Sequence, residues 1–104
     1  MTKYSAFLSP LAEAKLTLLL EYIEIEFGKS SRNKFFDKFK ESVYAIEKFP
    51  FSCTETEIDG IYKNIVSKQT SFYFRIREPK IEIITISDNR QDPKQIFKEL
   101  KNYP

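Results

Sequence analysis

Lysines, arginines, tyrosines and carboxylates are the side chains that could do chemistry in this chain, because it contains no histidine. Without histidine the usual general base near neutral pH is absent, together with Ser-His-Asp and Cys-His dyads and most zinc sites. The single cysteine, Cys53, supplies neither an internal disulfide nor a paired metal or redox motif. Two isolated glycines exclude a glycine-rich nucleotide-binding loop. We therefore expect no metal and no cofactor.

Basic residues are concentrated in the second part of the chain. Residues 1–60 contain 8 Lys+Arg against 10 Asp+Glu, a balance of −2, whereas residues 61–104 contain 9 against 5, a balance of +4. A basic surface of this kind fits a polyanionic or acidic partner. The basic and aromatic residues that could form it lie on or just after predicted strands: Tyr62, Lys63, Lys68, Tyr73, Arg75, Arg77 and Arg90.

Two interpretations of this basic and aromatic set stay open. On one face of a sheet such residues suit RNA, because guanidinium and ammonium groups bind phosphate while aromatic rings stack on bases. The same pattern is typical of solvated side chains on an exposed strand.

The stretch TISDNRQDP, residues 85–93, ends the last predicted strand. Ser87 to Asn89 have the residue types of a turn, and Pro93 suits the first position of a helix. Such a turn would place Arg90 beside the basic face of the sheet. Arg90 is therefore the strongest single candidate for a functional residue, although a solvated arginine in a turn is the simpler interpretation.

Two helices are predicted ahead of these strands. The first begins after an N-cap at Ser9, with Pro10 in its first turn, and ends at Gly28. The second lies between a serine cap at residues 30–31 and Pro50, which stops it. Apolar residues recur in both at three- and four-residue steps. The short link predicts an antiparallel helical hairpin.

The order of the predicted elements indicates the fold class. Outside the hairpin we predict strands at 3–8, 61–68, 71–77 and 80–87, a connecting loop at 51–60 and a short helix from Pro93 to about Lys101. The resulting order is β-α-α-β-β-β with a short C-terminal helix. It predicts an α+β protein in which the helical hairpin packs on one face of a small antiparallel sheet and leaves the other face exposed.

The length and composition indicate the domain organisation. At 104 residues there is room for one modest core, so we expect a single domain over residues 1–104. A hydrophobic content of 41% and a charged content of 31% are typical of soluble globular proteins. The sequence shows no apolar run of membrane-spanning length, and MTKYSAFLSP does not resemble a secretory signal. We therefore expect a cytoplasmic protein without a membrane partner.

Several motifs resemble, in order, the RelE/ParE family of type II toxins: LSPLAEA, FPF, IYKNIV, FYFRI and above all ITISDNRQDP. The likeness covers nearly the whole chain. It implies the architecture predicted above and a cytoplasmic bacterial toxin, of the kind found in plasmid stabilisation systems, that a small cognate antitoxin neutralises. Antitoxin tails commonly dock as a helix in a groove or as an added strand, so an apolar groove along the helical hairpin would seat the antitoxin.

The resemblance leaves the target open between two branches. RelE-like members cleave mRNA in the ribosomal A site, whereas ParE-like members poison DNA gyrase without hydrolysing anything themselves. By position, Lys63 matches a sheet lysine of the RelE-like pattern and Arg90 matches the arginine after the last strand, so these two are the candidate catalytic residues. The candidate target-binding residues are Lys68, Tyr73, Arg75, Arg77 and Asn89.

Two positions depart from the RelE-like pattern. The arginine expected on the middle strand falls near residues 70–71, and the expected C-terminal tyrosine falls on or beside Phe97. Arg75 or Tyr103 could replace them only by converging with Lys63. Each missing donor at a developing phosphorane charge would cost about 2.7 to 4 kcal/mol, or a hundredfold and more in rate. We therefore favour a ParE-like gyrase poison, with a RelE-like endoribonuclease and a non-toxic partner-binding module as the alternatives.

Overall fold

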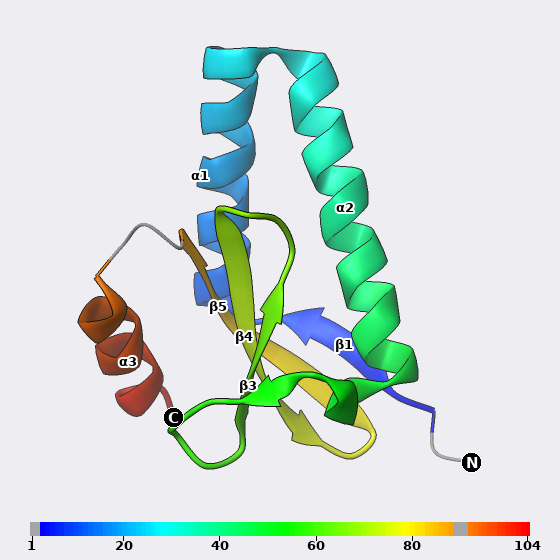
Figure 1. Cartoon of the computed structure of the whole chain (residues 1–104), viewed down its shortest axis with the longest axis vertical. Helices are drawn as coiled ribbons and strands as arrows, with labels where there is room; N and C mark the ends of the chain where they lie inside the picture. Colours follow the sequence, from blue (N-terminus) through cyan, green and yellow to red (C-terminus); the bar gives the residue numbers. More distant parts are fainter. Residues whose placement is uncertain (1–2, 89–91) are drawn as a thin grey trace.

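The computed structural model describes residues 3–88 and 92–104 of the chain. Its elements are, in order, β1 (Ser5–Leu8), α1 (Pro10–Phe27), α2 (Lys29–Lys48), the 3₁₀ turn η1 (Pro50–Ser52), β2 (Thr54–Glu55), β3 (Ile61–Ile65), β4 (Thr70–Arg77), β5 (Lys80–Asp88) and α3 (Pro93–Lys101). Figure 1 shows α1 and α2 rising together as a hairpin above the sheet, with α3 to one side. The predicted α+β class is confirmed, while η1 and β2 occupy the predicted loop at 51–60.

The strands form one mixed sheet in the order β1-β5-β4-β3-β2. Strands β2 to β5 pair antiparallel, but β1 pairs parallel with β5, with Ser5 opposite Lys80 and Leu8 opposite Ile83. The expectation of an entirely antiparallel sheet is therefore corrected. Strand periodicity predicts that β1 exists but not its neighbour or direction, and parallel neighbours need a long connection, which the intervening helices and strands provide.

The helical hairpin begins and turns at capping residues. The Ser9 hydroxyl accepts a hydrogen bond from the Ala12 N–H at 3.0 Å, and Pro10 opens α1 as predicted. Gly28, at φ +94°, separates α1 from α2, which starts at the next residue. The predicted serine cap at residues 30–31 is wrong, because a single glycine in the left-handed region is enough to turn the chain. Among the described helices, none has both the length and the apolar character to cross a membrane.

The face of the sheet toward the hairpin carries the main core. Phe72 and Phe74 of β4 and Ile81 of β5 are fully buried there, because alternate strand residues point to the same face. Phe39 of α2 packs edge-on against Phe72, with ring centroids 5.6 Å apart. The hairpin therefore covers this face with tightly packed apolar side chains, as predicted.

The opposite face, which was predicted to be exposed, is partly covered by α3 (Figure 1). Ile96 and Leu100 of α3 are buried in a second apolar cluster with Ile61, Tyr73 and Ile84 of the sheet. The expectation of an uncovered outer face is therefore wrong. Apolar residues at helical spacing predict α3 but do not indicate which surface it covers.

Candidate functional site

Lys63 and Tyr73 lie opposite each other on the outer face of the sheet. The register of β3 and β4 makes them direct cross-strand partners, and the Lys63 ammonium nitrogen lies 6.0 Å from the centre of the Tyr73 ring. Their neighbours Tyr62 and Phe74 point to the core instead, where their rings stack with centroids 5.6 Å apart. The predicted place of Tyr62 among the basic residues is therefore wrong, and the strands bring together one cation and one phenol.

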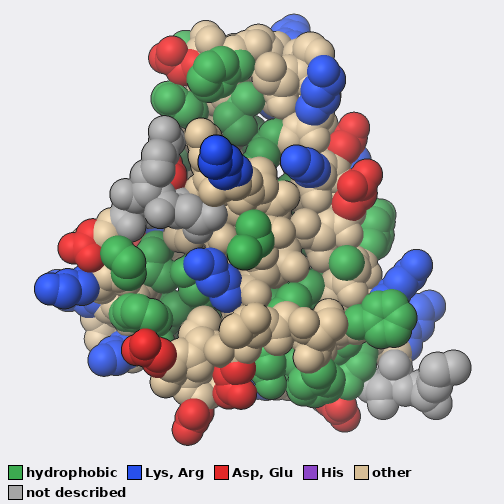
Figure 2. Space-filling model, viewed as in Figure 1, with side chains coloured by type: hydrophobic (Ala, Val, Ile, Leu, Met, Phe, Trp, Pro, Cys, Tyr) green, Lys and Arg blue, Asp and Glu red, His purple; other side chains and the backbone are tan. Residues whose placement is uncertain are grey.

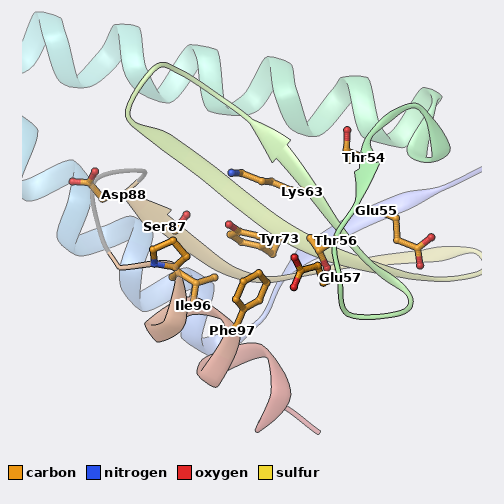
Figure 3. Close-up of a pocket in the computed structure, with 11 residues that line it drawn as sticks. Thr54, Glu55, Thr56, Glu57, Lys63, Tyr73, Ser87, Asp88, Ile96 and Phe97 are labelled. Atoms are coloured by element: carbon orange, nitrogen blue, oxygen red, sulfur yellow. The ribbon is translucent and has the colours of Figure 1, made fainter.

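A groove of about 320 Å³ opens around Lys63 and Tyr73 on the outer face of the sheet (Figure 3). Its lining comes from β2 and the segment after it, from β3, β4 and the end of β5, and from α3: Thr54, Glu55, Thr56, Glu57, Lys63, Tyr73, Ser87, Asp88, Pro93, Ile96 and Phe97. The helix supplies the apolar wall and the strands supply the polar groups. A concave site with an apolar wall and a few polar side chains is the usual form of a binding site.

Three polar groups of this groove are available to a ligand. Tyr73 is 8% exposed and Ser87 is 4% exposed, yet neither hydroxyl forms a hydrogen bond within the described part of the chain. Lys63 likewise forms no ion pair with a described residue. Figure 3 shows the Lys63 nitrogen and the two hydroxyl oxygens at the same end of the groove. Among the described residues the buried side-chain polar atom that lacks a partner is Asn64 Nδ2, so these three groups reach solvent and are accessible to a ligand that enters the groove.

Of the three acids in the described lining, Glu57 directs its carboxylate toward the groove in Figure 3, whereas the carboxylates of Glu55 and Asp88 point away from Lys63 and Tyr73. Glu55 and Glu57 come from β2 and the segment after it, and Asp88 ends β5. Glu55 accepts a hydrogen bond from a backbone N–H in the turn before β3 at 2.8 Å, which fixes its position. Glu55 lies on the same side of the sheet as its cross-strand partner Tyr62, and Asp88 has an interaction partner of its own, so Glu57 is the acid of the described lining that shares the groove with Lys63.

The surroundings of the groove do not form a strong anion site. Figure 2 shows the basic side chains on this side of the molecule separated by other residues instead of joined in one patch. Within residues 3–88 and 92–104, no three His, Cys, Asp or Glu side chains come together as a metal ion would require.

Arg75 and Tyr103, the predicted substitutes for the two missing nuclease residues, converge on Glu82. The Arg75 Nε lies 2.7 Å from one carboxylate oxygen of Glu82, and the Tyr103 hydroxyl donates to the other. Arg75 also donates to the Pro104 carbonyl oxygen at 3.1 Å and lies 5.0 Å from the centre of the Tyr103 ring. Both side chains therefore hold the C-terminal tail against the sheet and are not directed at Lys63.

These contacts shift two pKa values. Burial raises the pKa of Glu82, but the hydrogen bonds from Tyr103 and Arg75 and the positive charges of Arg75 and Arg77 outweigh it, so this pKa lies below its ordinary value of 4.5. The hydrogen bond to Glu82, and then burial, raise the pKa of Tyr103 above its ordinary value of 10.0. At neutral pH the carboxyl is ionised and the phenol is neutral, so Tyr103 is not prepared to act as a general base.

Further polar contacts hold α3 in place and, with it, the apolar wall of the groove. The Asp92 carboxylate caps the helix by accepting from the Lys94 N–H at 3.0 Å. Glu99 accepts from the Lys15 ammonium at 2.7 Å and from the Thr85 hydroxyl at 2.9 Å. The groove therefore depends on contacts between α3, the first helix and the last strand.

The other predicted site residues do not gather at the groove. Lys68 is exposed in the turn between β3 and β4, and Arg77 is exposed at the end of β4. Asn89 and Arg90 lie outside the described residues. Among the predicted site residues that the structure describes, the groove brings together two: Lys63 and Tyr73.

Several groove residues were not predicted from the sequence. Glu55 and Glu57 fall in the predicted loop, and Ser87 falls in the predicted turn although it belongs to β5. The alternation Thr-Glu-Thr-Glu at 54–57 is a weak strand signal that could have indicated β2. Phe97 lines the groove near the position where the resemblance places a tyrosine, so the hydroxyl expected there is absent.

A second groove, of about 530 Å³, lies along the helical hairpin, and it also touches the turn between β3 and β4. Its hairpin side is largely apolar: Leu18, Leu19, Tyr22, Ile23, Phe27 and Phe35. Leu18 and Phe27 are each 66% exposed, and Ile25 on the same helix is 80% exposed. Large apolar side chains exposed together mark an interaction surface.

No protein-family model and no curated protein matches the chain in sequence. Solved structures do match its fold. A chain from the chromosomal ParDE TA system of P. aeruginosa has a TM-score of 0.71 at 18% identity, over 83% of this chain and 96% of that one. A double mutant of the E. coli toxin RelE in the free state has a TM-score of 0.65 at 11% identity over 100% of both chains. The YoeB/ParE toxin from Agrobacterium tumefaciens has a TM-score of 0.60 at 11% identity, over 82% of this chain and 98% of that one. The chain therefore has the fold of the RelE/ParE toxins.

Proposed function

We propose that this chain is the toxin of a type II toxin-antitoxin system, a growth inhibitor that a cognate antitoxin neutralises. The similarity of its fold to structures of ParE, YoeB and RelE toxins supports this class. We take residues 1–104 as one toxin domain and the groove around Lys63 and Tyr73 as the surface that meets the target. Within the class we favour a ParE-like poison of DNA gyrase.

The charge of the groove is the observation that carries this preference. Cleavage of RNA needs several cationic donors around one phosphate, and binding of RNA needs basic groups along the backbone. The described lining offers one cation, Lys63, and the carboxylate of Glu57 faces the same space, while Arg75 is engaged by Glu82. A nucleic-acid backbone would therefore meet a single cation opposed by an acid in the described part of the groove. Binding of a protein target is therefore favoured over binding of mRNA.

The proposal assigns unequal roles to the predicted site residues. Lys63 and Arg90 are the residues on which inhibition would depend most. Lys68, Arg77 and Asn89 remain proposed target-binding residues, and of these Lys68 and Arg77 are not part of the groove lining. Tyr73 would contact it inside the groove, whereas Arg75, although predicted to bind the target, is assigned to holding the C-terminal tail.

A RelE-like endoribonuclease is the second candidate, because the groove places a lysine, a tyrosine and the carboxylate of Glu57 around one space. In such a reaction Glu57 would take the proton of the 2′-hydroxyl, whose oxygen then bonds to phosphorus. Lys63 would stabilise the charge on the phosphoryl oxygens, and Tyr73 would protonate the departing 5′-oxygen. The products would be a 2′,3′-cyclic phosphate and a 5′-hydroxyl. A module that only binds the antitoxin is the third candidate.

The groove along the hairpin is the proposed seat of the antitoxin. Exposed apolar side chains at helical spacing on α1, including Leu18, Tyr22 and Ile25, can be buried by the apolar face of a partner helix. The two grooves share Ser87 and Asp88 at the end of β5, so an antitoxin seated on the hairpin would also reach the edge of the target groove.

Induction of the chain alone in a bacterial host tests the three candidates together. We expect growth arrest with broken DNA or relaxed plasmid and with intact mRNA. Codon-spaced mRNA cleavages that disappear in Lys63→Met but persist in Lys48→Met, an exposed lysine of α2, would establish the nuclease instead. Unimpeded growth at good expression would reject the toxin and leave the binding module.

A further inference from the structure

We propose that Lys63, Tyr73 and Ser87 form a carboxylate-binding subsite, which takes an Asp or Glu side chain of a protein partner whose neighbouring residues are basic. The inference rests on the proposed function in one respect, because it assigns a protein instead of RNA to this groove. It adds the chemistry by which that partner is recognised.

The donors of the subsite are already in place and are not used by the described part of the chain. Tyr73 is more than nine-tenths buried, and its hydroxyl has no hydrogen-bond partner there. The Lys63 ammonium lies over the Tyr73 ring, and the Ser87 hydroxyl points to the same end of the groove (Figure 3). A carboxylate has two oxygens that can accept from an ammonium and a hydroxyl at once, and charge-assisted hydrogen bonds of this kind are strong.

The wall formed by α3 suits the rest of an acidic side chain. Ile96 is 4% exposed, and Phe97 lies beside it in the lining. The methylene groups of Asp or Glu would pack on this wall, which removes water from around the carboxylate. In such a low-dielectric place the hydrogen bonds to the carboxylate become stronger.

The acid that faces the groove selects against a phosphodiester chain. A phosphate bound at Lys63 would bring a neighbouring phosphate toward Glu57. A peptide can instead place lysine or arginine beside its carboxylate, and such a residue would pair with Glu57. Repulsion of the wrong ligand is a common source of specificity. The charges therefore favour a peptide with one acid beside a basic residue.

Titration of the full-length ¹⁵N-labelled chain with short blocked peptides tests the subsite. The probes are Ac-Lys-Glu-Lys-NH₂ and the matched Ac-Lys-Gln-Lys-NH₂, followed by NMR at the amides of Lys63, Tyr73 and Ser87. The glutamate peptide should shift these amides, and the glutamine peptide should bind about tenfold more weakly, since it cannot form charge-assisted hydrogen bonds. Inorganic phosphate and hexauridylate should each bind more weakly than the glutamate peptide.

Variants separate the subsite from general effects on the fold. Tyr73→Phe removes only an unpartnered hydroxyl and Lys63→Met only a charge, so each should keep the native spectrum and lose about tenfold in affinity. Lys48→Met, on the exposed side of α2, should bind like the wild type. Ac-Gln-Glu-Gln-NH₂ should bind more weakly than the lysine-flanked peptide, and Glu57→Gln should reduce this difference.

Three outcomes would overturn the inference. The first two are equal binding of the glutamate and glutamine peptides and absence of any peptide binding. The third is tighter binding of hexauridylate that depends on Lys63, and this result would assign the groove to RNA. Growth arrest by a chain that binds no peptide would reject the subsite alone. Peptide binding by a chain that does not arrest growth would reject the toxin and leave the subsite in place.

Discussion

The two faces of the sheet are built in different ways. On the inner face, two helices of 18 and 20 residues bury aromatic and branched side chains such as Phe72 and Phe74, which have no exposed surface. On the outer face, one helix of 9 residues buries Ile96 and Leu100 and is held by the polar contacts of Glu99 and Glu82. The inner face is a scaffold, whereas the outer face leaves a groove.

Adjacent residues of β4 point to the two different faces of the sheet. Phe72 points to the hairpin and packs on Phe39, while Tyr73 points to the groove and keeps an unpartnered hydroxyl. Alternation along one strand thus assigns neighbouring residues to stability and to binding. Substitutions on the two faces should therefore differ both in size and in the property that they change.

The largest effect is expected for Phe72→Ala on the inner face. Removal of a fully buried phenyl ring leaves a cavity and should lower the free energy of unfolding by about 3 to 5 kcal/mol. Chemical denaturation monitored by circular dichroism measures this loss. If Phe72→Ala lowered the free energy of unfolding by less than an outer-face variant does, the inner face would not be the scaffold.

A smaller effect is expected for Leu100→Ala on the outer face. Leu100 is 4% exposed, but α3 has only 9 residues and its surroundings can close over a small cavity, so the loss should be near the low end for such a change, about 2 kcal/mol. Hydrogen exchange should show faster exchange in α3 and little change in α2. Equal acceleration in both helices would mean that the two faces unfold as one unit.

Glu82→Gln should lower the free energy of unfolding at neutral pH by about 1 to 2 kcal/mol, because it removes a charged acceptor of Arg75 and Tyr103. The pKa of Glu82 is lower in the folded than in the unfolded chain. Its contribution is therefore fully present above about pH 4.5 and is lost as the pH falls through the lower folded pKa. Denaturation curves across this pH range should show the free energy of unfolding falling with pH in the wild type and falling less in the variant.

The smallest effect on stability is expected for Tyr73→Phe. The hydroxyl has no partner within the described residues, so its removal should change the free energy of unfolding by less than about 0.5 kcal/mol. The same denaturation experiment measures it beside Phe72→Ala. A loss above 1.5 kcal/mol, roughly a tenfold change in the folding equilibrium, would show that the hydroxyl belongs to the scaffold.

Much of the fold could be predicted because its signals are local. Ser9 and Gly28 mark the hairpin by their side-chain and backbone properties, and the alternation of Phe72 and Phe74 with Tyr73 indicates a strand with two distinct faces. The parallel pairing of β1 and the docking of α3 could not be predicted. Both depend on which surfaces meet, and periodicity within one element carries no information about its neighbour.

The site could be predicted only in part for the same reason. Lys63 and Tyr73 were identified by residue type on predicted strands, and the register confirms that they lie together. The ion pair between Arg75 and Glu82 could not be predicted, because it depends on contacts between β4, β5 and the C-terminal tail. Glu55 and Glu57 were missed because a two-residue strand is too short for a periodic signal.

The most direct test of a protein target at the groove is a DNA gyrase reaction with plasmid and the purified chain. The wild type and Lys48→Met should both cause cleaved plasmid to accumulate, whereas Lys63→Met should cause at least about tenfold less, because the proposed subsite loses its cation. Equal cleavage with Lys63→Met and the wild type would contradict a role for the groove. Absence of cleavage with the wild-type chain would contradict the action on gyrase itself.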